Sequence, residues 1–189
     1  MNTGVRLAKL ALATLLLMTD ARAGPPLTDF TDAATVDAFR VLNDGVMGGA
    51  STSSLRTSPE GMIFDGAVSL ANNGGFASCR GPLLVPMQAT RLLLTVRGDG
   101  QRYRLTLRAD DAPGTPLYQA SFVAPREWQT LRFENGDFAA SFRGRPVTAP
   151  LVRFSDMHFV GILIADGQAG PFRIELKTLA AEPPADLRP

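Results

Sequence analysis

Short segments with a period of two are the feature that most constrains the fold of this chain. Residues 172–177 read FRIELK, which places three apolar side chains on one face and three charged side chains on the other. The same alternation recurs in residues 62–70, 90–97 and 101–108. Successive side chains of a β-strand point to opposite faces, so these segments are predicted to be strands with one buried face. No long 3.6-residue repeat follows residue 23, and the fold class is therefore all-β.

Turn signals between these segments predict how the strands are connected. Gly98-Asp99-Gly100 joins two alternating runs and indicates a tight hairpin, and residues 112–116 form a longer loop. In residues 158–164 the side chains of both strand faces are largely apolar, as in a central strand covered on both faces. Residues 134–143 have no clean period and indicate an irregular turn or a short helix. The prediction is a single-domain antiparallel β-sandwich of the jelly-roll type.

The N-terminus carries the pattern of a secretory signal peptide. Arg6 and Lys9 precede an apolar run at 10–18, and Ala21-Arg22-Ala23 before Gly24 is a small-x-small cleavage pattern. The run is shorter than the roughly 20 apolar residues of a membrane span, so no transmembrane segment is expected after cleavage. We predict a periplasmic or secreted protein. A mitochondrial location would follow instead if this segment is a transit peptide.

Cleavage after Ala23 would divide the chain into three parts. Residues 1–23 are the signal peptide, residues 24–181 the β-sandwich domain, and residues 182–189 a loose, proline-containing tail.

Composition excludes several classes of function. The formal net charge of +1 gives no basic surplus for nucleic acid or an anionic membrane. Cys79 is the sole cysteine and is expected to be a buried, inert thiol, and His158 is the sole histidine and is expected at a strand end. No zinc site of Cys and His can be assembled, so we expect no metal, no cofactor and no enzyme activity. Loop carboxylates suit calcium, but no dedicated ligand spacing is present.

Two glycine-rich strings carry a resemblance to a known family. The strings are Asn43-Asp44-Gly45-Val46-Met47-Gly48-Gly49, followed by Ser51, and the segment from Phe64 to Ser78 that contains Asn72-Asn73-Gly74-Gly75-Phe76. Together with Arg97-Gly98-Asp99-Gly100, Phe142-Arg143-Gly144 and Gly170-Pro171-Phe172, they resemble the complex I intermediate-associated protein family from about Phe39 to Leu179.

The resemblance implies a galactose-binding-domain-like β-sandwich and a non-enzymatic role. The mitochondrial family member helps to assemble respiratory complex I in the matrix, whereas the signal peptide directs this chain outward. Phe39 stands where the family pattern often has Trp.

We therefore expect an exported assembly or scaffolding factor that holds a protein partner through its glycine-rich loops. A jelly roll brings several loops to one end, where polar side chains beside glycines can meet a partner. The alternative is a carbohydrate-binding module of the cell envelope, for which Trp128, Tyr103 and Tyr118 supply few aromatic faces. The candidate partner- or ligand-binding residues are Asn43, Asp44, Asn73, Arg97, Asp99 and Arg143.

Val46 and Met47 are apolar residues inside a loop that is otherwise rich in turn formers. Two arrangements remain open for this pair. The side chains can pack back onto the end of the sandwich and hold the loop rigid, or they can form an exposed contact surface.

Overall fold

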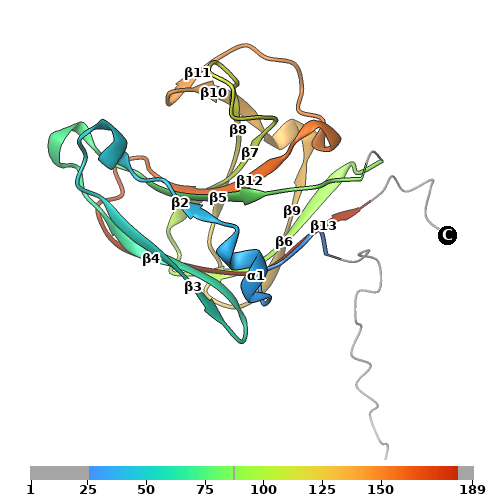
Figure 1. The fold of residues 1–189 in the computed structure, drawn as a ribbon, viewed down its shortest axis with the longest axis horizontal. Coiled ribbons are helices and arrows are strands. Elements are labelled where there is room, and N and C mark those ends of the chain that lie inside the picture. Colours follow the sequence, from blue (N-terminus) through green and yellow to red (C-terminus); the bar gives the residue numbers. More distant parts are fainter. Residues whose placement is uncertain (1–25, 87, 183–189) are drawn as a thin grey trace, which may run out of the picture.

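The computed structural model describes residues 26–86 and 88–182, which form two antiparallel β-sheets packed face to face (Figure 1). The expected antiparallel β-sandwich is confirmed. The signal peptide, its cleavage site and the tail beyond Glu182 lie outside the described residues.

The six-stranded sheet has the order β3-β4-β13-β6-β9, with β1 paired to β13. Its long strand β13 runs beside both β4 and β6, so residues from three distant parts of the chain share its outer face. β13 ends at Glu182, one residue beyond the predicted end of the domain. The strands are β1 (Thr28–Asp29), β3 (Thr52–Ser58), β4 (Gly61–Val68), β6 (Arg91–Gly98), β9 (Gln129–Glu134) and β13 (Gly170–Glu182).

The seven-stranded sheet has the order β11-β10-β8-β7-β12-β5-β2. β12 lies between β7 and β5, which confirms the central strand predicted from its apolar residues on both faces. The strands are β2 (Arg40–Val41), β5 (Ala77–Pro82), β7 (Arg102–Arg108), β8 (Leu117–Val123), β10 (Ala139–Phe142), β11 (Arg145–Pro146) and β12 (Phe159–Ile164).

Helices in the described residues are short. They are α1 (Ala33–Asp37) and the 3-10 turns η1 (Asp44–Met47), η2 (Ala71–Asn73), η3 (Asn135–Asp137) and η4 (Phe154–Asp156). Asp32 caps α1 by accepting from the backbone N–H groups of Ala34 and Thr35. None of these helices has the length and apolarity needed to cross a membrane. The segment 134–143 contains the expected turn as η3 but also strand β10, whose small residues hide any period.

A continuous series of aromatic rings fills the space between the sheets. Neighbouring centroids are 5.0–6.4 Å apart, and the tilted and edge-on contacts each add about 0.5–1.5 kcal/mol beyond the burial of area. The series links strands of both sheets to η4. Its members in order are Phe64, Phe172, Tyr103, Phe122, Phe133, Phe138 and Phe154.

The hairpin predicted at Gly98-Asp99-Gly100 is wrong. β6 belongs to the six-stranded sheet and β7 to the seven-stranded sheet, so these residues carry the chain across the sandwich. Gly98 is required at the crossing, because a Cβ there would lie 2.7 Å from the Cβ of Ala124. In a sequence, two alternating runs separated by a short glycine turn look the same whether the turn is a hairpin within one sheet or a crossing between two sheets. Only the partner chosen by each run distinguishes a hairpin from a crossing.

Cys79 and His158 lie where the sequence places them. Cys79 is buried on β5, and burial raises the pKa of its thiol to about 12. Such a thiol is protonated and unreactive at neutral pH. His158 directly precedes β12, is exposed, and has its Nδ1 atom 2.8 Å from the carbonyl oxygen of Ala109.

Candidate functional site

The carboxylate of Asp44 ties two glycine-rich loops together. Asp44 is fully buried, and its Oδ1 atom accepts from the backbone N–H of Ser51 at 3.0 Å. Its Oδ2 atom accepts from the Ser51 hydroxyl at 2.5 Å and from the N–H groups of Gly75 at 2.7 Å and Phe76 at 3.3 Å. We call residues 43–51 and 69–76, which this carboxylate joins, the double loop.

No ion pair to Asp44 exists within the described residues, so dipoles alone compensate its charge. Burial by itself would raise the pKa of this carboxyl. The hydrogen bonds from Ser51, Gly75 and Phe76 outweigh burial and hold the pKa below its usual value. Asp44 is therefore an internal anchor: its side chain is buried and occupied by these donors, and it is not exposed on the surface as a partner-binding residue would be.

The same carboxylate explains two of the glycines in the family strings. A Cβ on Gly49 would overlap the Asp44 side chain, and a Cβ on Gly74 would lie 2.5 Å from Asp44 Oδ2. Gly48 ends η1 with a φ of 86°, which favours glycine. These glycines let the backbone close around Asp44.

The tip of the double loop is apolar and exposed. Val46 and Met47 on η1 are 78% and 67% exposed, so they do not pack back onto the sandwich. Leu70, in the second loop, is also exposed, and the exposed Leu42 precedes the first loop. The Nδ2 group of Asn72 donates to the carbonyl of Gly48 at 3.2 Å and joins the two loops near this surface. We call Val46, Met47 and Leu70 the apolar tip.

Asn43 and Asn73 flank this tip in different ways. The Asn43 Oδ1 atom accepts from the Ser53 hydroxyl at 2.8 Å and fixes the start of the first loop. Asn73 is exposed and has a φ of 59°, a left-handed conformation that asparagine tolerates better than most residues. Of the six predicted site residues, the structure brings Asn43, Asp44 and Asn73 together.

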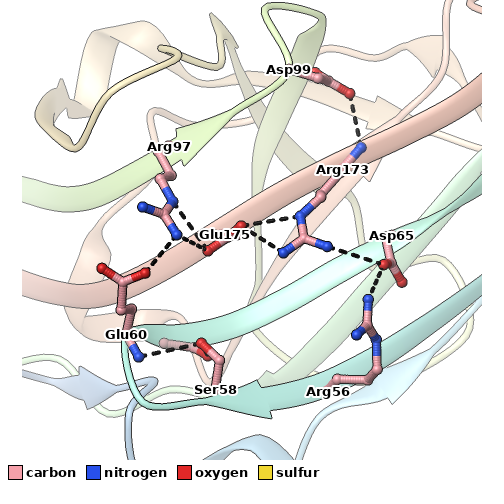
Figure 2. A network of polar contacts seen from close by, with 9 residues as sticks. Arg56, Ser58, Glu60, Asp65, Arg97, Asp99, Arg173 and Glu175 are labelled. Atoms are coloured by element: carbon pink, nitrogen blue, oxygen red, sulfur yellow. Dashed lines mark hydrogen bonds and ion pairs between the residues drawn. The ribbon is translucent and has the colours of Figure 1, made fainter.

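Arg97 lies on the outer face of the six-stranded sheet in a network of ion pairs (Figure 2). Its guanidinium donates to Glu175 on β13 at 2.7 and 3.1 Å and to Glu60 at 2.6 Å. Arg173 also donates to Glu175, at 2.8 and 3.0 Å, and it lies 3.9 Å from Asp65, which in turn pairs with Arg56. Opposite charges alternate throughout, so this network is balanced and self-contained.

Glu175 is the buried centre of that network. Burial alone would raise the pKa of its carboxyl, but the hydrogen bonds and charges of Arg97 and Arg173 hold the pKa below its usual value. The Arg97 guanidinium also lies 4.7 Å from the centroid of the Trp128 ring, and the Lys177 ammonium group lies 5.8 Å from it. Arg97 and Trp128 are thus engaged within the chain.

Asp99 is a structural residue at the crossing between the sheets. Its Oδ2 atom accepts from the Tyr103 hydroxyl at 3.0 Å and from the backbone N–H of Arg173 at 2.8 Å, and both of its oxygens accept from Gln101. Burial, together with the nearby charge of Asp99, raises the pKa of Tyr103. The side chains of Arg97 and Asp99 in the Arg97-Gly98-Asp99 string are therefore bound to groups of the chain itself.

Arg143 lies far from the double loop. It is at the tip of the two-residue turn between β10 and β11, where Arg143 and Gly144 have φ values of 49° and 76°. Its guanidinium lies 5.4 Å from the Phe142 ring, on the edge of the seven-stranded sheet opposite to β2. The six predicted residues therefore do not form one site. Asn43, Asp44 and Asn73 lie in the double loop, Arg97 and Asp99 lie at the end of β6, and Arg143 lies at the opposite sheet edge.

Sequence reasoning missed a set of arginines on the outer face of the seven-stranded sheet. Arg80 on β5 and Arg104 and Arg108 on β7 have the parity opposite to the core residues of their strands. The signal was present in the alternation of residues 101–108, where arginines fill the outward positions. No group of three or more His, Cys, Asp or Glu residues that could hold a metal occurs in 26–86 and 88–182.

The double loop should be sensitive to the chemistry of residue 44. We expect Asp44→Asn to lower the free energy of unfolding by about 2–4 kcal/mol at pH 7, because an amide NH₂ would face buried N–H donors. The pKa of Asp44 is lowered in the folded state, so its contribution is full above about pH 4 and declines as the pH falls below that value. Denaturant unfolding of both proteins between pH 7 and pH 3 measures this.

The matched control is Asp110→Asn. Asp110 also accepts from a backbone N–H group and a hydroxyl, those of Ala112 and Thr115, but it is exposed. Its replacement should cost much less than that of Asp44, because water can satisfy the groups that lose the exposed carboxylate. Equal losses for the two variants would show that Asp44 does not anchor the double loop.

The network around Glu175 should show the same dependence on acid. Glu175→Gln should cost roughly 1–3 kcal/mol at pH 7, because two arginines lose a charged acceptor. The pKa of Glu175 is lowered by folding, so the difference from the wild type should shrink as the pH falls below about 4.3. Glu134→Gln, which removes an exposed partner of Arg91, should change stability little. A gap between wild type and Glu175→Gln that is constant from pH 7 to pH 3 would contradict this account.

Solved structures with this shape include carbohydrate-binding modules. The family 11 carbohydrate-binding module of the cellulosomal cellulase Lic26A-Cel5E of Clostridium thermocellum has a TM-score of 0.61 at 10% identity, covering 85% of this chain and 94% of that one. The Clostridium thermocellum module in complex with a β-1,3-1,4-mixed-linked tetrasaccharide gives 0.59 at 11% identity, covering 84% and 94%. The agarase AgWH50C has a TM-score of 0.54 at 13% identity. The match covers 86% of this chain but only 25% of the agarase chain. At these identities the likeness shows the fold alone.

The sequence comparison identifies the family. No curated protein matches the chain. The model of the family described as complex I intermediate-associated protein 30 matches residues 28–176, which include the double loop and nearly all of both sheets. This chain therefore belongs to the complex I intermediate-associated protein 30 family.

Proposed function

We propose that this protein is a non-enzymatic assembly or scaffolding factor that holds a protein partner through the apolar tip of its double loop. The observation that carries the proposal is the exposure of Val46 and Met47, at 78% and 67%, on a loop whose base is fixed by the buried Asp44. Exposed apolar side chains that gather on one surface mark interaction sites more often than scattered ones do.

The anchor makes this tip suited to binding. A loop that is already ordered loses little conformational entropy when a partner docks, so more of the contact energy is retained as affinity. Met47 adds a flexible and polarisable side chain that adapts to an apolar surface. The tip is small, which suits a hot spot within a larger interface.

Three observations support a non-enzymatic role. Proteins with this family assignment and this fold are typically non-catalytic. The carboxylates of Asp44, Asp99 and Glu175 are occupied by internal donors. The Cys79 thiol is buried and protonated.

Polar substitution of the tip should abolish partner binding without loss of stability. We expect the double variant Val46→Ser and Met47→Ser to unfold within about 0.5 kcal/mol of the wild type, because both side chains are exposed. Partner capture should fall at least about tenfold, as for the loss of a hot spot worth more than 1.4 kcal/mol. Quantitative affinity purification from the cells that make the protein, followed by reconstitution with the purified partner, measures this.

Leu84→Ser is the matched control for that experiment. Leu84 is 80% exposed in the loop that follows β5, and it is not part of the apolar tip. It should keep the partner. A partner held equally well by the wild type and the double variant would show that the tip is not the docking surface.

We propose further that the protein acts outside the cytoplasm, in the periplasm or as a secreted factor. The N-terminal motif supports this, because a short apolar run with a small-x-small site is the pattern of a cleaved export signal. Cell fractionation and N-terminal sequencing should find a chain that starts at Gly24 in the envelope or medium. A full-length chain in the cytoplasm, or a mitochondrial chain cut elsewhere, would contradict export.

Carbohydrate binding is the second candidate function. The likeness to the family 11 modules over most of both chains favours it, and one of those structures contains a mixed-linked tetrasaccharide. The supply of aromatic faces weighs against a stacking site for neutral sugars, because Tyr103 and Tyr118 are buried and Trp128 lies against Arg97 and Lys177. Calorimetry with that tetrasaccharide tests this function directly.

A further inference from the structure

Three arginines surround one glycine in the middle of the seven-stranded sheet. Arg80 on β5 is the register partner of Gly161 on β12, and Thr106 on β7 is its partner on the other side. Arg104 and Arg108 lie two residues to either side of Thr106 and point to the same outer face. Diagonal neighbours in a sheet are about 7–8 Å apart, so the side chains of Arg80, Arg104 and Arg108 all leave the backbone within about 8 Å of Gly161. We call this outer surface the arginine face.

Arg40 extends the arginine face by one strand. It is the register partner of Arg80 across the β2–β5 pair, is exposed, and points to the same side. The arginine face therefore reaches from the edge strand β2 to the central strand β7, a distance of about 14 Å at the spacing of neighbouring strands.

Two donors of this face have no partner. The Nε atoms of Arg104 and Arg108 are buried and make no hydrogen bond within the described residues. Their other nitrogens are held in place: Arg104 donates to Gln119 at 2.7 Å and Arg108 to the carbonyl of Ala112 at 3.1 Å. Buried donors without acceptors cost free energy, so the guanidinium groups of the arginine face are less fully satisfied within the chain than those of the other sheet.

The charge on the arginine face is unbalanced. Asp111 lies 2.9 Å from Arg80 and 3.8 Å from Arg108, Asp166 pairs with Arg104, and the charge of Arg108 also acts on Asp110, so three carboxylates accompany four arginines. On the six-stranded sheet, the guanidinium groups of three arginines pair with three carboxylates, and a fourth carboxylate, that of Asp99, accepts from the Arg173 backbone N–H (Figure 2).

Neutral polar groups accompany the arginines. Thr106, Gln119 and Ser141 are each less than 10% exposed, although they lie on the face turned away from the core. The Gln119 amide donates to Ser141 and accepts from Arg104, which fixes its orientation beside the cationic groups. Hydroxyl and amide groups of this kind are suited to the hydroxyl groups of a sugar.

We propose that the arginine face binds an acidic saccharide, a glycan chain that carries a carboxylate on its sugar rings. Guanidinium groups bind carboxylates through paired, charge-assisted hydrogen bonds, and the flanking hydroxyl and amide groups hold the sugar ring. Asp111 and Asp166 stand beside the arginines and would repel a dianionic phosphate more strongly than a monoanionic uronate. The proposal rests on the second candidate function and names its ligand class and its face. It is independent of the apolar tip.

Isothermal titration calorimetry with defined tetramers tests the proposal. The probes are tetragalacturonate and tetramannuronate, their fully methyl-esterified forms, the neutral mixed-linked tetrasaccharide, and a hexaglutamate peptide. We expect at least one uronate tetramer to bind about tenfold or more tightly than its methyl ester, and the affinity to fall as salt rises.

Arg104→Gln should weaken uronate binding about tenfold or more, and so should Arg80→Gln, which keeps the test open if the first variant unfolds. Arg56→Gln removes the same charge from the other sheet, where Arg56 pairs with Asp65, and should leave binding unchanged. Thermal unfolding confirms that each variant is folded.

The other outcomes distinguish a failure of the acidic-saccharide proposal from a failure of carbohydrate binding in general. Equal binding of uronates and their methyl esters, or of the neutral tetrasaccharide, would overturn the acidic-ligand inference and retain carbohydrate binding. No binding of any saccharide would overturn both. Hexaglutamate binding as tight as that of the uronates would show a general site for acidic chains and overturn the assignment to a saccharide.

Discussion

One apolar core, shared by the inner faces of both sheets, is the constraint on which the rest of the molecule depends. Each strand must place alternate side chains in this core, so the remaining side chains are forced outward. The two outer faces then carry different sets of these outward residues. One carries the balanced network around Glu175, and the other carries the partly unsatisfied arginines beside Gly161. The second face therefore keeps donors that no acceptor in the described part of the chain satisfies.

The double loop depends on a second constraint, the burial of the Asp44 carboxylate. A buried charge is costly unless donors surround it, and the backbone must bend tightly to bring Ser51, Gly75 and Phe76 to one side chain. Glycine at position 49 permits that approach. The fixed base leaves Val46 and the neighbouring Met47 exposed on a rigid support.

The sequence located important residues more reliably than it described their roles. Asp44 belongs to the double loop, but its side chain is an internal anchor. The exposed surface of that loop is formed by Val46 and Met47. Asp99 and Arg97 are likewise occupied by internal partners. A polar residue next to glycine looks the same in a sequence whether its partner is internal or external. Only the positions of distant donors, such as those on β13, decide between the two.

The sequence by itself determined the fold class, the family strings and the face of most side chains, because alternation and turn chemistry are local properties. It also located the central strand β12, whose residues are apolar on both faces. Tertiary structure alone decided that β6 and β7 belong to different sheets, that one carboxylate ties two loops, and that Arg80 meets Arg104 and Arg108 on one surface. These features join residues far apart in the chain, and pairing between distant strands is set by how the whole core packs.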